Sequence, residues 1–154
     1  MQIACHAWAY NNLSLEEAVG TIARLGFRYI DLGSGPHLDV LRAAAQPHAE
    51  ASRILRLLEP FNLSITDLYL MMPGINSPDP ARRDDELALF EQLVPFAAAL
   101  GTPGITVSPG ILYKDGPDHS LARALPALMR MVDAVEDTDL RLSFEPHMDS
   151  VAQR

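Results

Sequence analysis

Apolar positions recur at two different spacings, and these spacings alternate from one segment of the chain to the next. Short runs in which apolar and polar residues alternate predict β-strands, and we expect strands at residues 2–8, 29–33, 63–70, 105–108 and 141–145. Longer stretches repeat apolar residues every three or four positions and predict helices, at residues 14–25, 47–61, 80–100 and 120–135. This alternation of strand and helix is typical of α/β proteins.

The beginnings of two predicted helices carry capping signals. Ser14 and Glu17 have the spacing of a capping box. Asp79 supplies an N-cap for the third helix, and Pro80 places a proline at its first position. Pro95 lies inside the pattern of this third helix and should kink it or end it early, because proline has no N–H to donate.

The repeated strand–helix–strand order predicts parallel strands, because a crossover helix returns the chain to the same end of the sheet. A flavodoxin-like, doubly wound sheet of five strands suits the length, but it needs a fifth helix over the last strand, and only residues 148–154 remain. A complete (β/α)₈ barrel has about 250 residues. We therefore expect one domain over residues 1–154, the amino-terminal part of a TIM barrel with about five strands and four helices.

One face of each predicted strand becomes more polar toward the strand's carboxyl end. Side chains two positions apart share a face, so the inward set of each strand can be read from the sequence. These sets are His6 and Trp8, Tyr29 and Asp31, Ile65, Asp67 and Tyr69, Thr106 and Ser108, and Ser143, Glu145 and His147. Barrel enzymes collect functional side chains at the carboxyl-terminal rim of the strands. We expect such a rim to consist of His6, Asp31, Asp67, Ser108, Glu145 and His147.

Glu145 is the strongest functional candidate on this rim. A buried carboxylate must be paired, bound to a metal or protonated, and the only cation within four residues is Arg141, at the other end of the strand. The neighbouring candidates also have structural explanations. Asp31 and Asp67 can cap turns, and His6 can be a hydrogen-bonded interior side chain.

Composition and charge narrow the class of protein. The formal net charge of −8 argues against a nucleic-acid partner or an anionic membrane surface. No apolar run approaches the roughly 20 residues of a membrane helix, and we see no signal peptide. Cys5 is the only cysteine, which excludes an internal disulfide and favours a reducing compartment. We therefore expect a cytoplasmic protein, and its sequence has no phosphate-binding P-loop or dinucleotide-binding glycine motif.

Three segments resemble the xylose-isomerase-like TIM barrels, the family of sugar phosphate isomerases and epimerases. The segments are LSLEEAVGTIARLGFRYIDLG, NSPDPARRDDELALFEQLVPFAAALGTPGITVSPG and LRLSFEPH. In this order and spacing, the resemblance extends over essentially the whole chain. It implies a TIM barrel of which the chain contains the amino-terminal part.

The resemblance also implies a site at the barrel mouth. Family members typically bind one divalent metal (Mn²⁺, Mg²⁺, Co²⁺ or Zn²⁺) through a Glu on strand five, an Asp on strand six, a His on strand seven and a Glu on strand eight. The epimerases use the two glutamates as an acid/base pair. Glu145 matches the strand-five ligand and base. The residues implied to contact substrate, together with those of the predicted rim, are His6, Trp8, Asp31, His37, Asp67, Ser108 and His147.

The resemblance therefore implies an isomerase or epimerase of a sugar, sugar phosphate or polyol, with a small sugar-like substrate. Three of the four implied metal ligands would lie on strands that this chain lacks, so we expect the 154-residue chain to be weakly active or inactive. Two alternatives use the same barrel: an AP-endonuclease-like metal hydrolase and an inosose-type dehydratase. A third is a non-catalytic half-barrel that self-associates, because open edges and an unfilled interior need a partner. We expect a homo-oligomer.

Overall fold

A parallel sheet organises the chain. The computed structural model describes residues 3–153, with strands β1 (Ala4–His6), β2 (Tyr29–Gly33), β3 (Ser64–Leu70), β4 (Gly104–Val107) and β5 (Arg141–Phe144). Each strand pairs in parallel with the next one in the sequence, so the order across the sheet is β1-β2-β3-β4-β5. A flavodoxin-like sheet has the strand order 2-1-3-4-5. That alternative is therefore wrong, and the sequential order of a TIM barrel is confirmed.

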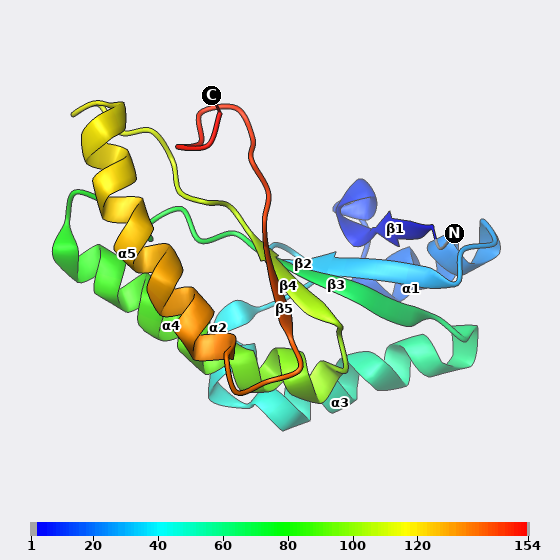
Figure 1. Ribbon diagram of the computed structural model, residues 1–154. Helices are drawn as coiled ribbons and strands as arrows, with labels where there is room; N and C mark the ends of the chain where they lie inside the picture. The colour runs from blue at the N-terminus through cyan, green and yellow to red at the C-terminus, as the bar shows by residue number, and fades with distance from the viewer. Residues whose placement is uncertain (1–2, 154) are drawn as a thin grey trace.

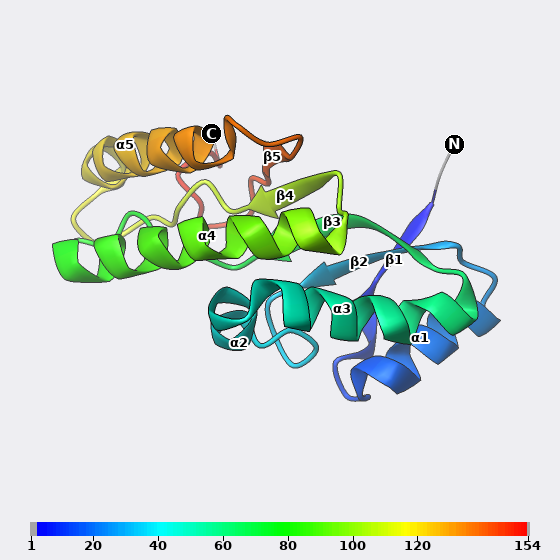
Figure 2. The ribbon, with the colours of Figure 1, turned by 90° about the horizontal axis from the view of Figure 1, so that it is seen from below.

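The helices form a row along one face of this sheet. They are α1 (Leu15–Arg24), α2 (Val40–Ala45), α3 (Pro47–Leu58), α4 (Pro80–Leu100) and α5 (Pro117–Val135), with short 3₁₀-helices η1 (Ala7–Tyr10) and η2 (Glu59–Phe61). Helices α1, α3, α4 and α5 contact one another in that order, and α3, α4 and α5 run side by side in Figures 1 and 2. No helix of residues 3–153 is long and apolar enough to cross a membrane.

Two features at the amino-terminal end differ from expectation. The loop after β2 contains a helix that the sequence did not indicate, α2, so there are five α-helices rather than about four among the described residues. Asp39 caps it by accepting a hydrogen bond from the Arg42 N–H at 3.0 Å. The first strand ends at His6 and the chain enters η1, so the assignment of Trp8 to a strand is wrong. Gln2, the predicted start of this strand, lies outside the described residues.

The capping predictions are confirmed, whereas the early helix end that Pro95 could cause is not found. Ser14 and Glu17 form the capping box of α1. Asp79 caps α4 by accepting a hydrogen bond from the Ala81 N–H at 3.0 Å. α4 then continues through Pro95 without ending. The residues on both sides of this proline are buried in the core, and their packing outweighs the loss of one backbone hydrogen bond.

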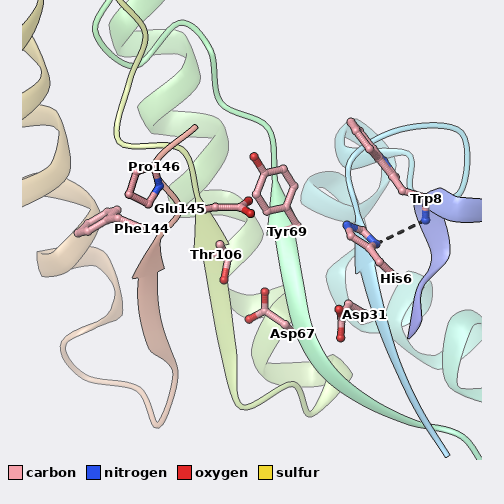
Figure 3. Close-up of a pocket in the computed structure, with 9 residues that line it drawn as sticks. All are labelled: His6, Trp8, Asp31, Asp67, Tyr69, Thr106, Phe144, Glu145 and Pro146. Carbon is pink, nitrogen blue, oxygen red and sulfur yellow. Dashed lines mark hydrogen bonds between the residues drawn. The ribbon is translucent and has the colours of Figure 1, made fainter. Parts of the chain in front are cut away.

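A bulge between β2 and β3 changes which side chains face inward. Ile30 pairs with Ile65, but Asp31 pairs with Asp67, so β3 carries one extra residue at this point. Ile65 is consequently buried against the helices. The inward set that grouped Ile65 with Asp67 and Tyr69 was therefore wrong for Ile65. Asp67 and Tyr69 point to the face that carries no helix of residues 3–153 (Figure 3).

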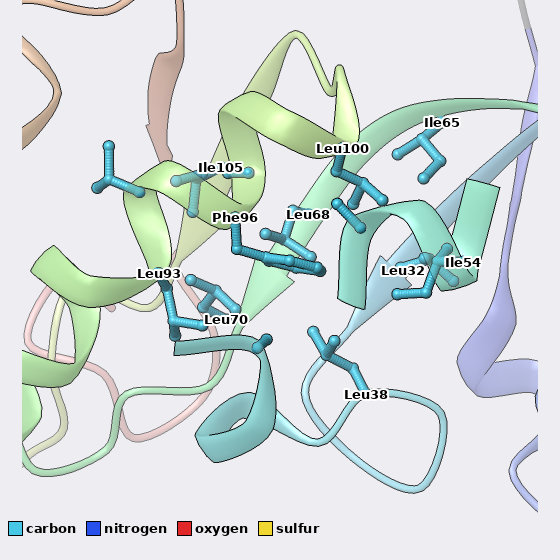
Figure 4. Close-up of a cluster of buried hydrophobic side chains, with 14 of the residues drawn as sticks. Leu32, Leu38, Ile54, Ile65, Leu68, Leu70, Leu93, Phe96, Leu100 and Ile105 are labelled. Carbon is cyan, nitrogen blue, oxygen red and sulfur yellow. The ribbon is translucent and has the colours of Figure 1, made fainter. Parts of the chain in front are cut away.

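The apolar core lies between the sheet and the row of helices. Leu32, Leu68, Leu70 and Ile105 project from three strands toward the helices, and all four are fully buried. Phe96 of α4 lies among the strand side chains and is also fully buried (Figure 4). The Phe96 ring fills the space between α4 and the side chains of several strands. The packing of α4 on the sheet therefore depends strongly on this ring.

The substitution Phe96→Ala should lower the free energy of unfolding by about 3–5 kcal/mol, because it removes buried surface and leaves a cavity. Urea unfolding followed by circular dichroism measures this change. Phe144→Ala is the matched control, because Phe144 is 40% exposed at the sheet edge and should cost much less. Equal losses for the two variants would contradict this account of the core.

Candidate active site

The carboxyl ends of the strands surround a cavity of about 580 Å³ on the open face of the sheet. Residues from all five strands or from the segments directly after them line it. They are His6, Trp8, Asp31, Asp67, Tyr69, Thr106, Phe144, Glu145 and Pro146 (Figure 3). A cavity at this end of a parallel sheet is where α/β barrels place their active sites.

The predicted site residues divide into two groups in the structure. Those that line the cavity are His6, Trp8, Asp31, Asp67 and Glu145. Those that do not are His37, Ser108 and His147. The geometry therefore brings together the part of the predicted rim that lies on or next to β1, β2, β3 and β5.

The second group is engaged in loop contacts. The Ser108 hydroxyl and the His147 Nε2 are 2.8 Å apart, and the other ring nitrogen of His147 lies 2.7 Å from the Met148 carbonyl oxygen. Ser108 follows the end of β4 and is buried. His37 is also buried, with its Nε2 3.0 Å from the Leu13 carbonyl oxygen. In this chain these side chains hold loops next to the cavity in place.

Three aromatic rings form one side of the cavity, which we call the aromatic wall: His6, Trp8 and Tyr69. The rings of His6 and Trp8 are stacked, with centroids 6.0 Å apart and an interplanar angle of 22°. Tyr69 presents its ring at a steep angle to both, at 6.3 Å from His6 and 6.5 Å from Trp8. The Trp8 indole N–H donates to the Ser34 carbonyl oxygen at 2.9 Å and fixes the outer end of the wall.

Gly33 lets this wall come close to β2. A Cβ atom at position 33 would lie 3.1 Å from the Tyr69 carbonyl oxygen and 3.2 Å from the His6 Cε1 atom. Both separations are tighter than ordinary contacts, so a larger residue would displace the His6 ring or the β3 backbone at Tyr69. The absence of a side chain at position 33 therefore leaves room for His6 beside β3.

Two aspartates lie deeper in the cavity. Asp31 and Asp67 are paired residues on β2 and β3, and the Thr66 hydroxyl donates to the Asp31 carboxylate at 2.6 Å. Burial raises the pKa of Asp67 above its ordinary value, and the negative charge of Asp31 adds to this, while a hydrogen bond with Thr106 and the charge of Arg141 oppose it. The Asp67 carboxylate therefore binds a proton more tightly than a surface aspartate does.

Glu145 lies beside Tyr69 at the edge of the cavity. β5 ends one residue earlier than predicted, at Phe144, but the Glu145 N–H still donates to the Val107 carbonyl oxygen at 2.9 Å. The residue is exposed, so the expectation of a buried carboxylate is wrong for this chain. Burial raises the pKa of the Tyr69 phenol, and the nearby negative charge of Glu145 raises it further.

Tyr69 and Thr106 line the cavity but are not among the site residues that the sequence predicts. Strand parity places both on inward faces, but neither carries a charge that would mark it as functional. The signal that could have identified them was their position near the carboxyl ends of β3 and β4. Ser108 was chosen on β4 instead, but the strand ends before it and its side chain turns to His147.

The described residues do not form a metal site by themselves. Among residues 3–153, no group of three or more His, Cys, Asp or Glu side chains is arranged to hold a metal ion. Glu145 stands at the end of the fifth strand without a second ligand close by, and Asp31 and Asp67 belong to the deeper part of the cavity. A cation at Glu145 would need further ligands from outside the described chain.

The chain belongs to the xylose isomerase-like TIM barrel family. The model of this family matches residues 19–153, which confirms the resemblance seen in the sequence. A search of curated proteins finds no match to the chain.

Solved structures with this fold include several sugar epimerases. The D-allulose 3-epimerase from Methylomonas sp. in complex with D-allulose has a TM-score of 0.74 at 20% identity, over 97% of this chain and 52% of its own. The 3-keto-D-glucoside 4-epimerase from E. coli has a TM-score of 0.73 at 16% identity, over 97% of this chain and 57% of its own. A D-psicose 3-epimerase in the presence of D-fructose has a TM-score of 0.71 at 17% identity, over 94% and 52%. The chain thus spans about half the length of these proteins, and identities this low show the fold alone.

The substitution Glu145→Gln should lower the pKa of Tyr69 toward its ordinary value, because a negative charge next to the phenol disappears while burial remains. The tyrosine titration is followed by ultraviolet difference absorbance, with Tyr69→Phe identifying the contribution of this residue. Glu59→Gln, a change at an exposed residue of η2, is the control and should leave the titration unaltered. An unchanged or higher pKa in the Glu145 variant would contradict the contact.

Proposed function

We propose that this chain forms half of the active site of a sugar isomerase or epimerase, which moves a proton on a carbon next to a carbonyl group. The observation that supports this most is the position of Glu145. It follows the fifth strand of a xylose isomerase-like barrel, and its carboxylate faces a cavity beside the aromatic wall. Sugar epimerases are among the solved structures that share the fold.

In this proposal each cavity residue has a role that its chemistry supports. Glu145 accepts the proton from the carbon next to the carbonyl, as a general base does. The aromatic wall packs against the C–H face of the sugar. Asp67 accepts hydrogen bonds from sugar hydroxyls through its carboxylate, and the Thr106 hydroxyl can both donate and accept.

A single carboxylate does not complete this chemistry. An epimerase must remove a proton from one face of a carbon and return one to the other, which requires a second acid/base group. We also propose a divalent cation, of which the chain offers Glu145 as one ligand. An Asp, a His and a Glu at three further strand ends of a longer polypeptide, read from the coding sequence after Arg154, would support the cation, and their absence would count against it.

D-fructose and D-allulose should produce a saturable change in the fluorescence of Trp8, which is the only tryptophan and lines the cavity. Asp67→Asn should weaken this binding by roughly tenfold, because it removes a charged hydrogen-bonding partner. Asp118→Asn, at an exposed position in the first turn of α5, is the matched control and should bind as the parent chain does. No saturable change in fluorescence, or an equal loss of sugar affinity in both variants, would contradict the proposed sugar site.

The same sugars separate the candidate activities. Incorporation of solvent deuterium next to the carbonyl, detected by NMR, indicates isomerase or epimerase chemistry. For the 154-residue chain this exchange should be far slower than the roughly 1–10³ s⁻¹ of typical enzymes. Loss of water from the sugar would indicate the dehydratase, whereas the metal hydrolase would be detected by cleavage of a separate phosphodiester substrate.

A second candidate function, self-association without catalysis, is favoured by one flank of α5. The flank that faces away from α4 carries an apolar stripe: Leu121, Leu125, Met129 and Val132, which are 43%, 55%, 61% and 41% exposed. On the opposite flank, Arg130 pairs with Glu91 of α4 at 2.6 Å. α5 contacts β5, whose outer edge pairs with no strand of residues 3–153. Exposed apolar surface beside an open strand edge is typical of an association site, and we propose a second copy of the chain as its occupant.

If this proposal is correct, the chain sediments as a dimer, and Met129→Glu weakens the dimer by at least about tenfold, because it buries an unpaired charge. Ala122→Glu, which adds the same charge at an exposed position outside the stripe, should have little effect. Analytical ultracentrifugation over a range of concentrations measures both. A monomeric parent chain with a cooperative melt would rule out the second copy.

A further inference from the structure

Trp8 is the most exposed ring of the aromatic wall, and the element that carries it is short. Its side chain is 40% exposed, and η1 has only four residues. A 3₁₀-helix of this length is weakly stabilised by its own hydrogen bonds. The Trp8 backbone N–H donates to the Nδ1 atom of His6 at 3.4 Å, which is a long bond (Figure 3). The support that fixes the indole must therefore come from another part of the fold.

Ser34, which directly follows β2, provides this support through three hydrogen bonds. Its carbonyl oxygen accepts the bond from the Trp8 indole N–H at 2.9 Å. Its own N–H donates to the Tyr69 carbonyl oxygen at 2.9 Å, and its hydroxyl oxygen accepts from the Met71 N–H at 3.1 Å. The acceptor of the indole bond is thus tied to β3 and to the segment after it, so it is a fixed point and not part of a loose loop.

Gly35 leaves room for the indole beside this acceptor. A Cβ atom at position 35 would lie 3.0 Å from the Trp8 Nε1 atom, which is the atom that donates the bond. The φ angle of Gly35 is +142°, which residues with a side chain rarely adopt. Its carbonyl oxygen accepts a hydrogen bond from the N–H of the buried Leu38 at 3.2 Å, which closes the turn. A side chain at position 35 would therefore meet the indole nitrogen directly.

We propose that the Ser34–Gly35 turn is a positioning element for Trp8, which holds the indole in one orientation at the cavity before a ligand binds. The inference deepens the proposed function and rests on it only in taking a sugar as the ligand. A side chain that is already immobile loses no further freedom when a ligand binds to it. Trp8 can therefore offer its apolar face to a sugar without a cost of ordering, although it is exposed.

Two other descriptions of Trp8 make different predictions. If stacking on His6 alone holds the ring, the indole N–H exchanges with solvent about as quickly as that of free indole. If the indole is a mobile flap that closes over the sugar, its local motion is large in the free chain and decreases when sugar is added. We expect slow exchange and little local motion, both with and without sugar.

The decisive experiment uses the single tryptophan of the chain and needs no ligand. Hydrogen exchange of the indole N–H, measured by NMR, should be at least roughly tenfold slower than that of free indole. Time-resolved fluorescence anisotropy should show little motion of the indole on the nanosecond timescale. Rapid exchange or large local motion in the parent chain overturns the proposal, whether or not any variant folds.

The substitution Gly35→Ala should accelerate this exchange by roughly tenfold, because the added methyl group displaces the indole nitrogen from the Ser34 carbonyl oxygen. Gly26→Ala is the matched control. Gly26 also has a positive φ, of +89°, but a Cβ atom there would meet nothing within 4 Å. The control therefore carries the backbone strain without the crowding, and its indole should exchange as in the parent chain. Unchanged exchange in Gly35→Ala, or equal acceleration in both variants, overturns the proposal.

Sugar binding is the readout that a merely structural role would not change. Gly35 does not line the cavity, yet Gly35→Ala should raise the Kd for D-fructose by roughly 2- to 10-fold, because the freed ring must be ordered on binding. Isothermal titration calorimetry measures this Kd, and Gly26→Ala should match the parent chain. A freed indole with an unchanged Kd overturns the positioning role. If no chain binds sugar, the proposed function alone fails, because exchange and anisotropy still decide whether the turn holds Trp8.

Discussion

The bulge in β3 is the constraint on which both faces of the sheet depend. Side chains alternate between the two faces of a strand, so one extra residue reverses every position that follows. With the extra residue, Leu68 and Leu70 enter the core, and Asp67 and Tyr69 enter the cavity. A regular strand that began with Ile65 in the core would place Asp67 and Tyr69 among apolar side chains. Burial of that carboxylate would cost far more than the irregular pairing does.

The cavity and the apolar stripe of α5 have the same origin. A barrel closes when each strand and each helix has neighbours on both sides. In residues 3–153 the row of helices ends at α5 and the sheet ends at β5, so an apolar helix flank and a strand edge lie open together. For the same reason, Glu145 is exposed at the rim. In a closed barrel a neighbouring strand would lie beside it.

The cavity combines a rigid centre with a loosely held edge. The aromatic wall and the aspartate pair come from β1, η1, β2 and β3, where side chains pack against one another or pair in register. Glu145 comes from the last strand and has only a few restraints. Tyr69 and Glu145 lie next to each other in the cavity, so the two parts meet there.

The sequence by itself determined the alternation of elements, most of their boundaries and the faces of four of the five strands. These properties follow from local patterns such as the capping box at Ser14 and the cap at Asp79. It also indicated Asp31, Asp67 and Glu145, because carboxylates are conspicuous in apolar strands. Tertiary structure alone decided the bulge, the exposure of Glu145, the pairing of Ser108 with His147 and the place of Tyr69 in the wall. Each of these depends on how segments far apart in the chain come together. The spacing of apolar residues within one strand or helix does not specify such contacts.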